Sequence, residues 1–235
     1  MYASLPGVLQ RFQGYCIWIL LMSDAFVSPT IVNELNLDQR VHLGLLSIRS
    51  LLYSFYARKR RDDPVNAHHI SELWNLTVKM IGKRDRPELK AKAAETRCMI
   101  EFTVELLATH KQFLAPGVGD LLHQAGVELV SYYETINTAP RILTDAQRRS
   151  LMDNYLRHCV LFERVAPGMY LPKHHLMVHL NQRTAFLGNP RVYHTYVDES
   201  LNGTLAKIAR SSHRTTFSYT VLQKYKLLEA VKPSV

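Results

Sequence analysis

Cysteine is scarce in this chain of 235 residues and does not occur in clusters. The three cysteines, Cys16, Cys98 and Cys159, are odd in number and lie far apart in the sequence. They match neither a disulfide framework nor a zinc knuckle, both of which need close or regularly spaced pairs. We therefore expect a protein of a reducing compartment, and no cofactor is predicted.

Long hydrophobic runs are also lacking. The longest apolar run near the start, residues 15–22, is well short of the roughly 20 residues that cross a bilayer. A secretory signal would need a basic region before this run and small residues after it, but only Arg11 and then Ser23 and Asp24 are found there. The absence of acidic residues before Asp24 slightly favours an organelle transit segment. The sequence predicts an intracellular protein, mitochondrial or nuclear, that is neither secreted nor membrane-spanning.

Glycine and proline are limited to ten each, and the chain is 47% hydrophobic and 21% charged. This composition excludes bulk disorder and collagen-like repeats. Acidic residues are the scarcer charged class, 20 against 29 basic ones, which leaves a formal net charge of +9. Such an excess favours a polyanionic partner, either nucleic acid or an anionic membrane surface.

Apolar residues recur at helical spacing through residues 35–165 and predict five successive amphipathic helices. We expect them at 37–57, 70–81 and 87–113, then from residue 122 to before Pro140, and from a capping box at Thr144 and Gln147 to before Ala166. The last turn of the first helix is followed by the cations 58–61, which suit the negative end of the helix dipole.

Only residues 14–22 and 191–197 have a β-like composition, and the second stretch is rich in aromatic and β-branched residues. The predicted fold class is therefore mainly α, a helical bundle with a small β element near the C-terminal third. We expect three parts: an N-terminal apolar segment (1–34), the helical bundle (35–165) and a C-terminal segment with basic helices (166–235).

Two histidines stand four residues apart in a segment that begins with the helix-compatible Pro172. On a helix, His175 and His179 would share one face, the spacing at which histidine pairs can bind zinc. A metalloprotease needs a carboxylate beside the first histidine, where this chain has Leu176. A structural role inside the fold is the favoured interpretation, and metal binding is the weaker alternative.

An acidic pair, Asp198 and Glu199, comes just before a stretch from residue 205 to 228 that contains no acid. One interpretation is helix capping, since negative charge is favoured at a helix N-terminus. The other is a metal-binding carboxylate beside a phosphate-binding surface, as in two-metal phosphoryl transfer. Capping is the favoured interpretation of the two.

The order of these features resembles the C-terminal part of eukaryotic cut-and-paste transposases of the RNase H-like, DDE type. The motifs that carry the resemblance are Pro172-Lys173-His174-His175-x-x-x-His179-Leu180, then Gly188-x-Pro190, then Glu199, then a basic helix. The resemblance implies that the β element is the remnant of an RNase H-like fold. It also implies that Glu199 matches the third catalytic acid, with His175 and His179 on the supporting helix.

The resemblance does not extend to the first two catalytic aspartates of such enzymes. These lie on strands before the helical insertion, and residues 1–34 are too short to contain that sheet; Asp24 is the only acid before Glu34. One carboxylate cannot hold two metal ions, because several acidic ligands must converge. We therefore expect no catalysis, and Glu199 is at most a vestigial candidate.

Basic residues cluster at 58–61, at 79–97 and in the tail from 207 to 226. A single cluster is usually a solvated face, but three favour phosphate contacts. Residues 211–219 mix hydroxyls, cations and rings, which suits looped or single-stranded RNA, although no standard RNA-binding signature is present. The predicted nucleic-acid-binding residues are Arg58, Lys59, Arg60, Arg61, Lys83, Arg84, Lys173, Lys207, Arg210, Arg214 and Lys224.

These observations lead to one hypothesis and two alternatives. The favoured hypothesis is a non-catalytic, transposase-derived protein that binds nucleic acid, RNA rather than DNA, with other proteins of a large ribonucleoprotein such as an organellar ribosome. The first alternative is a DNA transposase or recombinase subunit that receives its missing acidic residues from another chain. The second is a protein-binding helical scaffold whose charge serves solubility.

Overall fold

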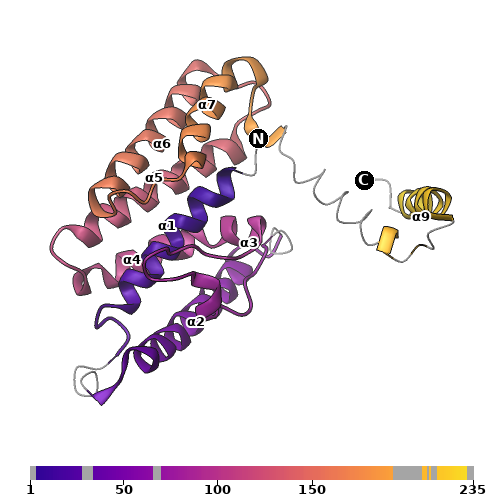
Figure 1. The fold of residues 1–235 in the computed structure, drawn as a ribbon. Helices are drawn as coiled ribbons and strands as arrows, with labels where there is room; N and C mark the ends of the chain where they lie inside the picture. The colour runs from indigo at the N-terminus through magenta and orange to yellow at the C-terminus, as the bar shows by residue number, and fades with distance from the viewer. Residues whose placement is uncertain are drawn as a thin grey trace. The chain divides into compact units, whose positions relative to one another are not determined.

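The computed structural model describes residues 4–27, 34–65, 70–192, 208–210, 212 and 216–231, and these residues are mainly helical (Figure 1). Contacts divide the chain into two compact units. The first is Ala3–Val192, and the second is Tyr193–Val235 with the first two residues. In the second unit the described part is mainly helix α9, Phe217–Val231.

The first unit is built around a helix pair, α5 (Val118–Thr138) and α6 (Asp145–Val165). Their short connection makes them antiparallel neighbours, and they pack together more extensively than any other two elements. Helix α7 (Pro172–Leu187) lies on α6, and α4 (Ile100–His110) lies on α5. Figure 1 shows α5, α6 and α7 as one layer of neighbouring helices.

Helix α1 (Ser4–Leu21) joins this layer to the rest of the unit. It contacts α7, α4, α3 (Ala93–Cys98) and α2 (Leu37–Asp62). Phe12 is fully buried and meets Phe162 of α6 edge-on, with ring centroids 5.5 Å apart. The contact between α1 and α6 is therefore part of the core, which also includes buried residues of α2 and α4 such as Leu52 and Leu107.

The β-like expectation for residues 14–22 was wrong, because most of this stretch belongs to helix α1. Its buried residues, such as Phe12, Cys16 and Leu20, recur every four positions along the helix. Several elements cover α1, so its sequence is nearly continuously apolar and lacks the polar face that identifies a helix by periodicity.

The expected helix at 70–81 was also wrong. The chain is irregular up to residue 77, and only the short 3₁₀ helix η3 (Val78–Ile81) follows. Leu73 donates its backbone N–H to the Tyr56 hydroxyl at 3.2 Å, and the Tyr53 hydroxyl donates to the Trp74 carbonyl. Tyrosine hydroxyls of α2 thus bind backbone groups that a helix would pair internally. The side chain of Trp74 is 63% exposed.

The single helix expected at 87–113 is instead an extended lead-in, two α-helices and the 3₁₀ helix η4 (Lys111–Phe113). Residues 87–92 precede α3, and Met99 separates α3 from α4. Leu89 donates its N–H to the Gln10 carbonyl of α1 at 2.8 Å. This backbone group is therefore hydrogen-bonded to another element and not within a helix of its own. Pro87 is paired with Gly82 in an isolated β-bridge and does not start a helix.

Other expectations were confirmed. Thr144 and Gln147 form the predicted capping box at the start of α6, with Thr144 Oγ1 accepting from the Gln147 N–H at 3.2 Å. Pro172 is the first residue of α7. Helix α2 is longer than predicted and contains the cations at 58–61 in its last turns.

The small β element expected near the C-terminal third is not seen in the part of the chain that the structure describes. Pro190–Val192 forms the 3₁₀ helix η5, and positions 193–197 of the β-like stretch lie outside the described residues. No described helix combines the length and the apolar character that crossing a membrane would require.

Burial of His158 gives the stability of this fold a pH dependence. Its Nδ1 lies 2.9 Å from the Ala125 carbonyl, and burial lowers its pKa to about 4. Between pH 6.5 and 4, His158 is protonated in the unfolded chain but stays neutral in the folded one. The free energy of unfolding therefore falls as the pH falls through this window. The variant His158→Phe keeps an aromatic ring among the surrounding rings but removes the titrating group. Between pH 7 and 4 we expect its free energy of unfolding to fall by roughly 3 kcal/mol less than that of the wild type.

Urea denaturation at each pH measures this difference in unfolding free energy. The exposed His42, changed to Gln, is the control and should keep the wild-type pH dependence. Parallel pH profiles for wild type and His158→Phe would contradict the assignment.

Candidate functional site

The candidate interface with nucleic acid is the segment 79–92, which we name the basic loop; it includes most of η3 and ends just before α3. Its turn is closed by the Gly82–Pro87 bridge and by two backbone hydrogen bonds, Arg86 N–H to the Lys83 carbonyl and Glu88 N–H to the Ile81 carbonyl, both 3.1 Å. Gly82 has φ 73° and ψ −160°, a conformation open essentially to glycine alone.

Helix α1 holds the basic loop by side chains as well as by its backbone. Arg11 donates from Nη1 to the Pro87 carbonyl at 2.8 Å, Trp18 from Nε1 to the Ile81 carbonyl at 3.0 Å, and Gln10 from Nε2 to the Ala91 carbonyl at 3.1 Å. The ends of the turn are therefore fixed against a buried helix, and only its tip and its charged side chains face solvent.

The basic loop carries six cations and two acids. Lys92 forms an ion pair with Glu95 at 3.7 Å. The other five cations are exposed, and no ion pair joins them to any residue within the described ranges. They are Lys79, Lys83, Arg84, Arg86 and Lys90.

The cation cluster of α2 has a different environment, because each of its members meets a carboxylate. Arg58 contacts both carboxylate oxygens of Glu105, at 2.5 and 2.6 Å. The other pairs are Lys59 with Glu101, Arg60 with Glu72 and Arg61 with Asp62. The first two pairs tie α2 to α4, and the four together cancel most of the cluster's charge. Nucleic-acid binding by its members stays a prediction.

The histidine pair of α7 shares one helix face, as predicted, but lies at the surface instead of inside the fold. His175 and His179 are exposed, and their Nε2 atoms are 2.8 Å apart, so one imidazole donates to the other. The Nδ1 atom of His179 contacts Gln182 Oε1 at 3.1 Å. Among the described residues there is no cluster of three or more potential ligands of the His, Cys, Asp and Glu type.

The buried histidine of α7 is His174, which the sequence reasoning did not single out; it is 5% exposed. It lies on the same side of the helix as Met177, Leu180 and Asn181, which are also buried. That pattern starting at Pro172 is the signal that could have found it. Lys173 is half-buried, with its aliphatic stem over Gly7 of α1.

The remaining predicted site residues belong to the second unit. Arg210 and Lys224 are exposed there, and Lys224 is on α9. Glu199, Lys207 and Arg214 lie outside the described residues.

Comparisons of the chain with protein-family models, with curated proteins and with solved structures found no match.

The backbone of Gly82 provides a test of the basic loop. A Cβ atom at this position would lie 2.8 Å from the Arg86 carbonyl oxygen and 2.8 Å from the Glu88 nitrogen. We expect Gly82→Ala to lower the free energy of unfolding by about 2–3 kcal/mol, through backbone strain and this overlap. Gly117→Ala is the matched control, since Gly117 has φ 77° but open space around it, and we expect a loss of about 1 kcal/mol.

Urea denaturation of the two variants measures both losses. Equal losses would show that the turn is not closed by the contacts described above.

Proposed function

We propose that this protein binds nucleic acid through the phosphates of its backbone and does not cleave it. The observation that carries the proposal is the set of five exposed cations on the basic loop that have no carboxylate partner among the described residues. A cation without a protein partner can meet a phosphate without first breaking an ion pair, and it releases a counterion when it does so.

The anchoring of the basic loop supports the same proposal. Because Arg11, Trp18 and Gln10 of α1 fix its ends, the loop presents its cations from a held turn. Less conformational freedom is then lost when phosphates bind. Phosphate contacts of this kind give affinity and register but carry no sequence information, so we infer binding that depends little on base sequence.

RNA is the proposed ligand in preference to DNA, within a ribonucleoprotein that contains other proteins, in the mitochondrion or the nucleus. The support is the mixture of hydroxyl, cationic and aromatic residues at 211–219, which suits stacking and phosphate bonding on looped RNA. The resemblance to transposases supports the further proposal that this protein derives from a transposase. In this view the C-terminal segment keeps a small β element of an RNase H-like fold, and Glu199 is a vestigial acid.

Neutralising the basic loop tests the proposal. In the variant Lys83→Gln, Arg84→Gln, Arg86→Gln we expect weaker binding to structured RNA and to duplex DNA. The slope of log affinity against log salt should fall in magnitude by roughly 2 to 3, because each lost phosphate contact removes about one released counterion. Fluorescence anisotropy titrations at several salt concentrations measure both quantities.

The control variant is Arg141→Gln, Arg149→Gln, Arg164→Gln, which changes the net charge by the same amount at exposed positions outside the loop. It should keep a salt slope close to that of the wild type. Equal losses in both variants would mean that only net charge matters, and weak, salt-independent binding by the wild type would end the proposal.

A separate measurement addresses catalysis. We expect no strand cleavage of DNA or RNA by the full chain with Mg²⁺ or Mn²⁺, because the resemblance provides one acidic residue where a two-metal centre needs several. The assay follows end-labelled strands on denaturing gels. Cleavage that disappears in Glu199→Gln would overturn the non-catalytic assignment and favour a recombinase subunit.

A further inference from the structure

Helix α7, which packs on α1 and α6, carries two exposed imidazole rings side by side. They belong to His175 and His179, one helical turn apart, and their ring centroids are 4.4 Å apart. The two Nε2 atoms are 2.8 Å apart. Because both residues belong to one regular helix, α7 alone sets this spacing.

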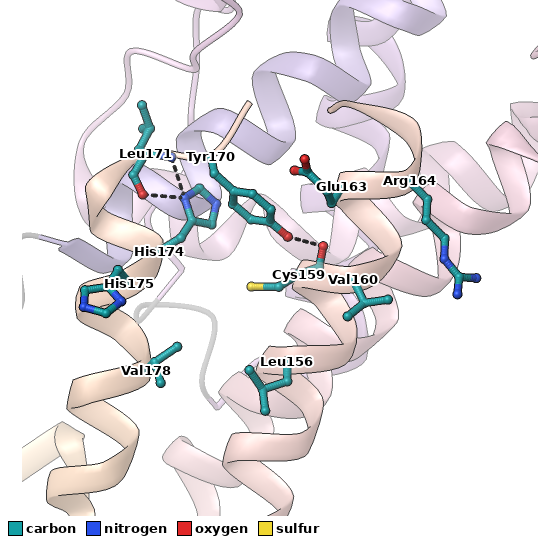
Figure 2. Close-up of a pocket in the computed structure, with 10 residues that line it drawn as sticks. All are labelled: Leu156, Cys159, Val160, Glu163, Arg164, Tyr170, Leu171, His174, His175 and Val178. Atoms are coloured by element: carbon teal, nitrogen blue, oxygen red, sulfur yellow. Dashed lines mark hydrogen bonds between the residues drawn. The ribbon is translucent and has the colours of Figure 1, made fainter. Parts of the chain in front are cut away.

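The adjacent His174 does not belong to this pair. Figure 2 shows its ring beside Tyr170 and Leu171, with His175 apart from these residues. The Nδ1 atom of His174 lies 3.0 Å from the Leu171 nitrogen, and its ring packs edge-on against Tyr170. Since His174 is buried, His175 and His179 are the histidines of α7 that can bind a ligand from solvent.

Gln182, almost one turn further along α7, determines which nitrogen of His179 carries a lone pair. Its Oε1 atom lies 3.1 Å from His179 Nδ1. An amide oxygen can only accept, so in the neutral ring the proton is on Nδ1 and the lone pair is on Nε2. His175 then donates its own Nε2–H to this lone pair. A hydrogen bond from the second ring nitrogen is also what orients histidines that bind metals.

The separation of the two Nε2 atoms suits neighbouring ligands of one metal ion. At a metal–nitrogen distance of about 2.0 Å, cis ligands of a square-planar or octahedral ion are about 2.8 Å apart, and ligands of a tetrahedral ion are about 3.3 Å apart. The 2.8 Å between His175 and His179 agrees with the first arrangement. Rotation of the two exposed rings about their side-chain bonds turns both nitrogens toward a shared ion.

We propose that His175 and His179 chelate one Cu²⁺ ion through their Nε2 atoms. Imidazole nitrogen suits Cu²⁺, which prefers tetragonal geometry and binds nitrogen sites more tightly than the other divalent ions of its row. A closed tetrahedral zinc site needs four protein ligands, and the described residues contain no group of three candidates. Water takes the remaining positions on copper, and in the complex His175 has its other neutral tautomer, with the proton on Nδ1.

This site is independent of the proposed nucleic-acid binding, because it uses none of the basic loop cations. The test is a calorimetric titration of the full chain, free of nucleic acid, with CuCl₂ in a weakly coordinating buffer. We expect one tight site per chain, and ZnCl₂ should bind it roughly tenfold more weakly. Electron paramagnetic resonance of the copper complex should show a tetragonal Cu²⁺ signal with nitrogen ligands.

Two variants test the spacing of the pair. His175→Gln leaves one ligand, and we expect its Cu²⁺ affinity to fall roughly 100-fold, because no second imidazole then binds within the same molecule. The double variant His179→Gln, Gln182→His keeps two histidines on this face but places them about 10 Å apart along the helix. It cannot chelate one ion and should lose as much affinity. All three positions are exposed, so both variants should keep the wild-type circular dichroism.

The control is His42→Gln, which removes an exposed histidine of α2 and should bind Cu²⁺ like the wild type. Wild-type affinity in the double variant would overturn the proposal, because any two exposed histidines would then suffice. Tighter binding of Zn²⁺ than of Cu²⁺ would overturn it as well and would indicate tetrahedral ligation. Absence of saturable Cu²⁺ binding, or an unchanged nitrogen signal in His175→Gln, would also contradict it.

Discussion

The burial of helix α1 is the constraint on which the rest of the described molecule depends. One side of this helix packs its rings on α6, where Phe12 meets Phe162 and His158. The other side holds the basic loop through hydrogen bonds from Arg11 and Trp18. Dispersion and hydrophobic contacts fix the helix in place, and its polar groups then fix the loop.

A segment could be predicted from the sequence where its conformation is set by residues within the segment itself. The capping box at Thr144 and the start of α7 at Pro172 are local signals, and both were confirmed. Residues 70–77 carry a helix-like pattern but bond to tyrosines of α2, and the apolar run at 14–22 looks β-like because neighbours cover it. Tertiary contacts decided these two segments, and no local pattern reports them.

The candidate site shows the same limit for charges. The basic clusters at 58–61 and 79–97 look alike in the sequence, which does not show which of their cations meet a carboxylate in the fold. The acids that pair with Arg58 and Lys59 are Glu105 and Glu101, which lie 47 and 42 positions away in the chain. The contacts of α2 with α4 and with Glu72 make one cluster nearly neutral, and the other keeps five exposed cations without an ion pair among the described residues. Composition gives the net charge, but the fold determines which cations are left without a carboxylate partner.

Arg11 connects the basic loop to His174 of helix α7. Its guanidinium is bonded to the Pro87 carbonyl at the base of the basic loop and has no carboxylate partner in the described chain. Burial is the main cause of the lowered pKa of His174. The positive charge of Arg11 lies close enough to this ring to lower its pKa further. A buried positive charge thus supports the turn on one side and disfavours protonation of the imidazole on the other. The two ends of this connection nevertheless respond differently to salt, since the exposed cations of the loop are screened within about 10 Å whereas the buried guanidinium is screened much less.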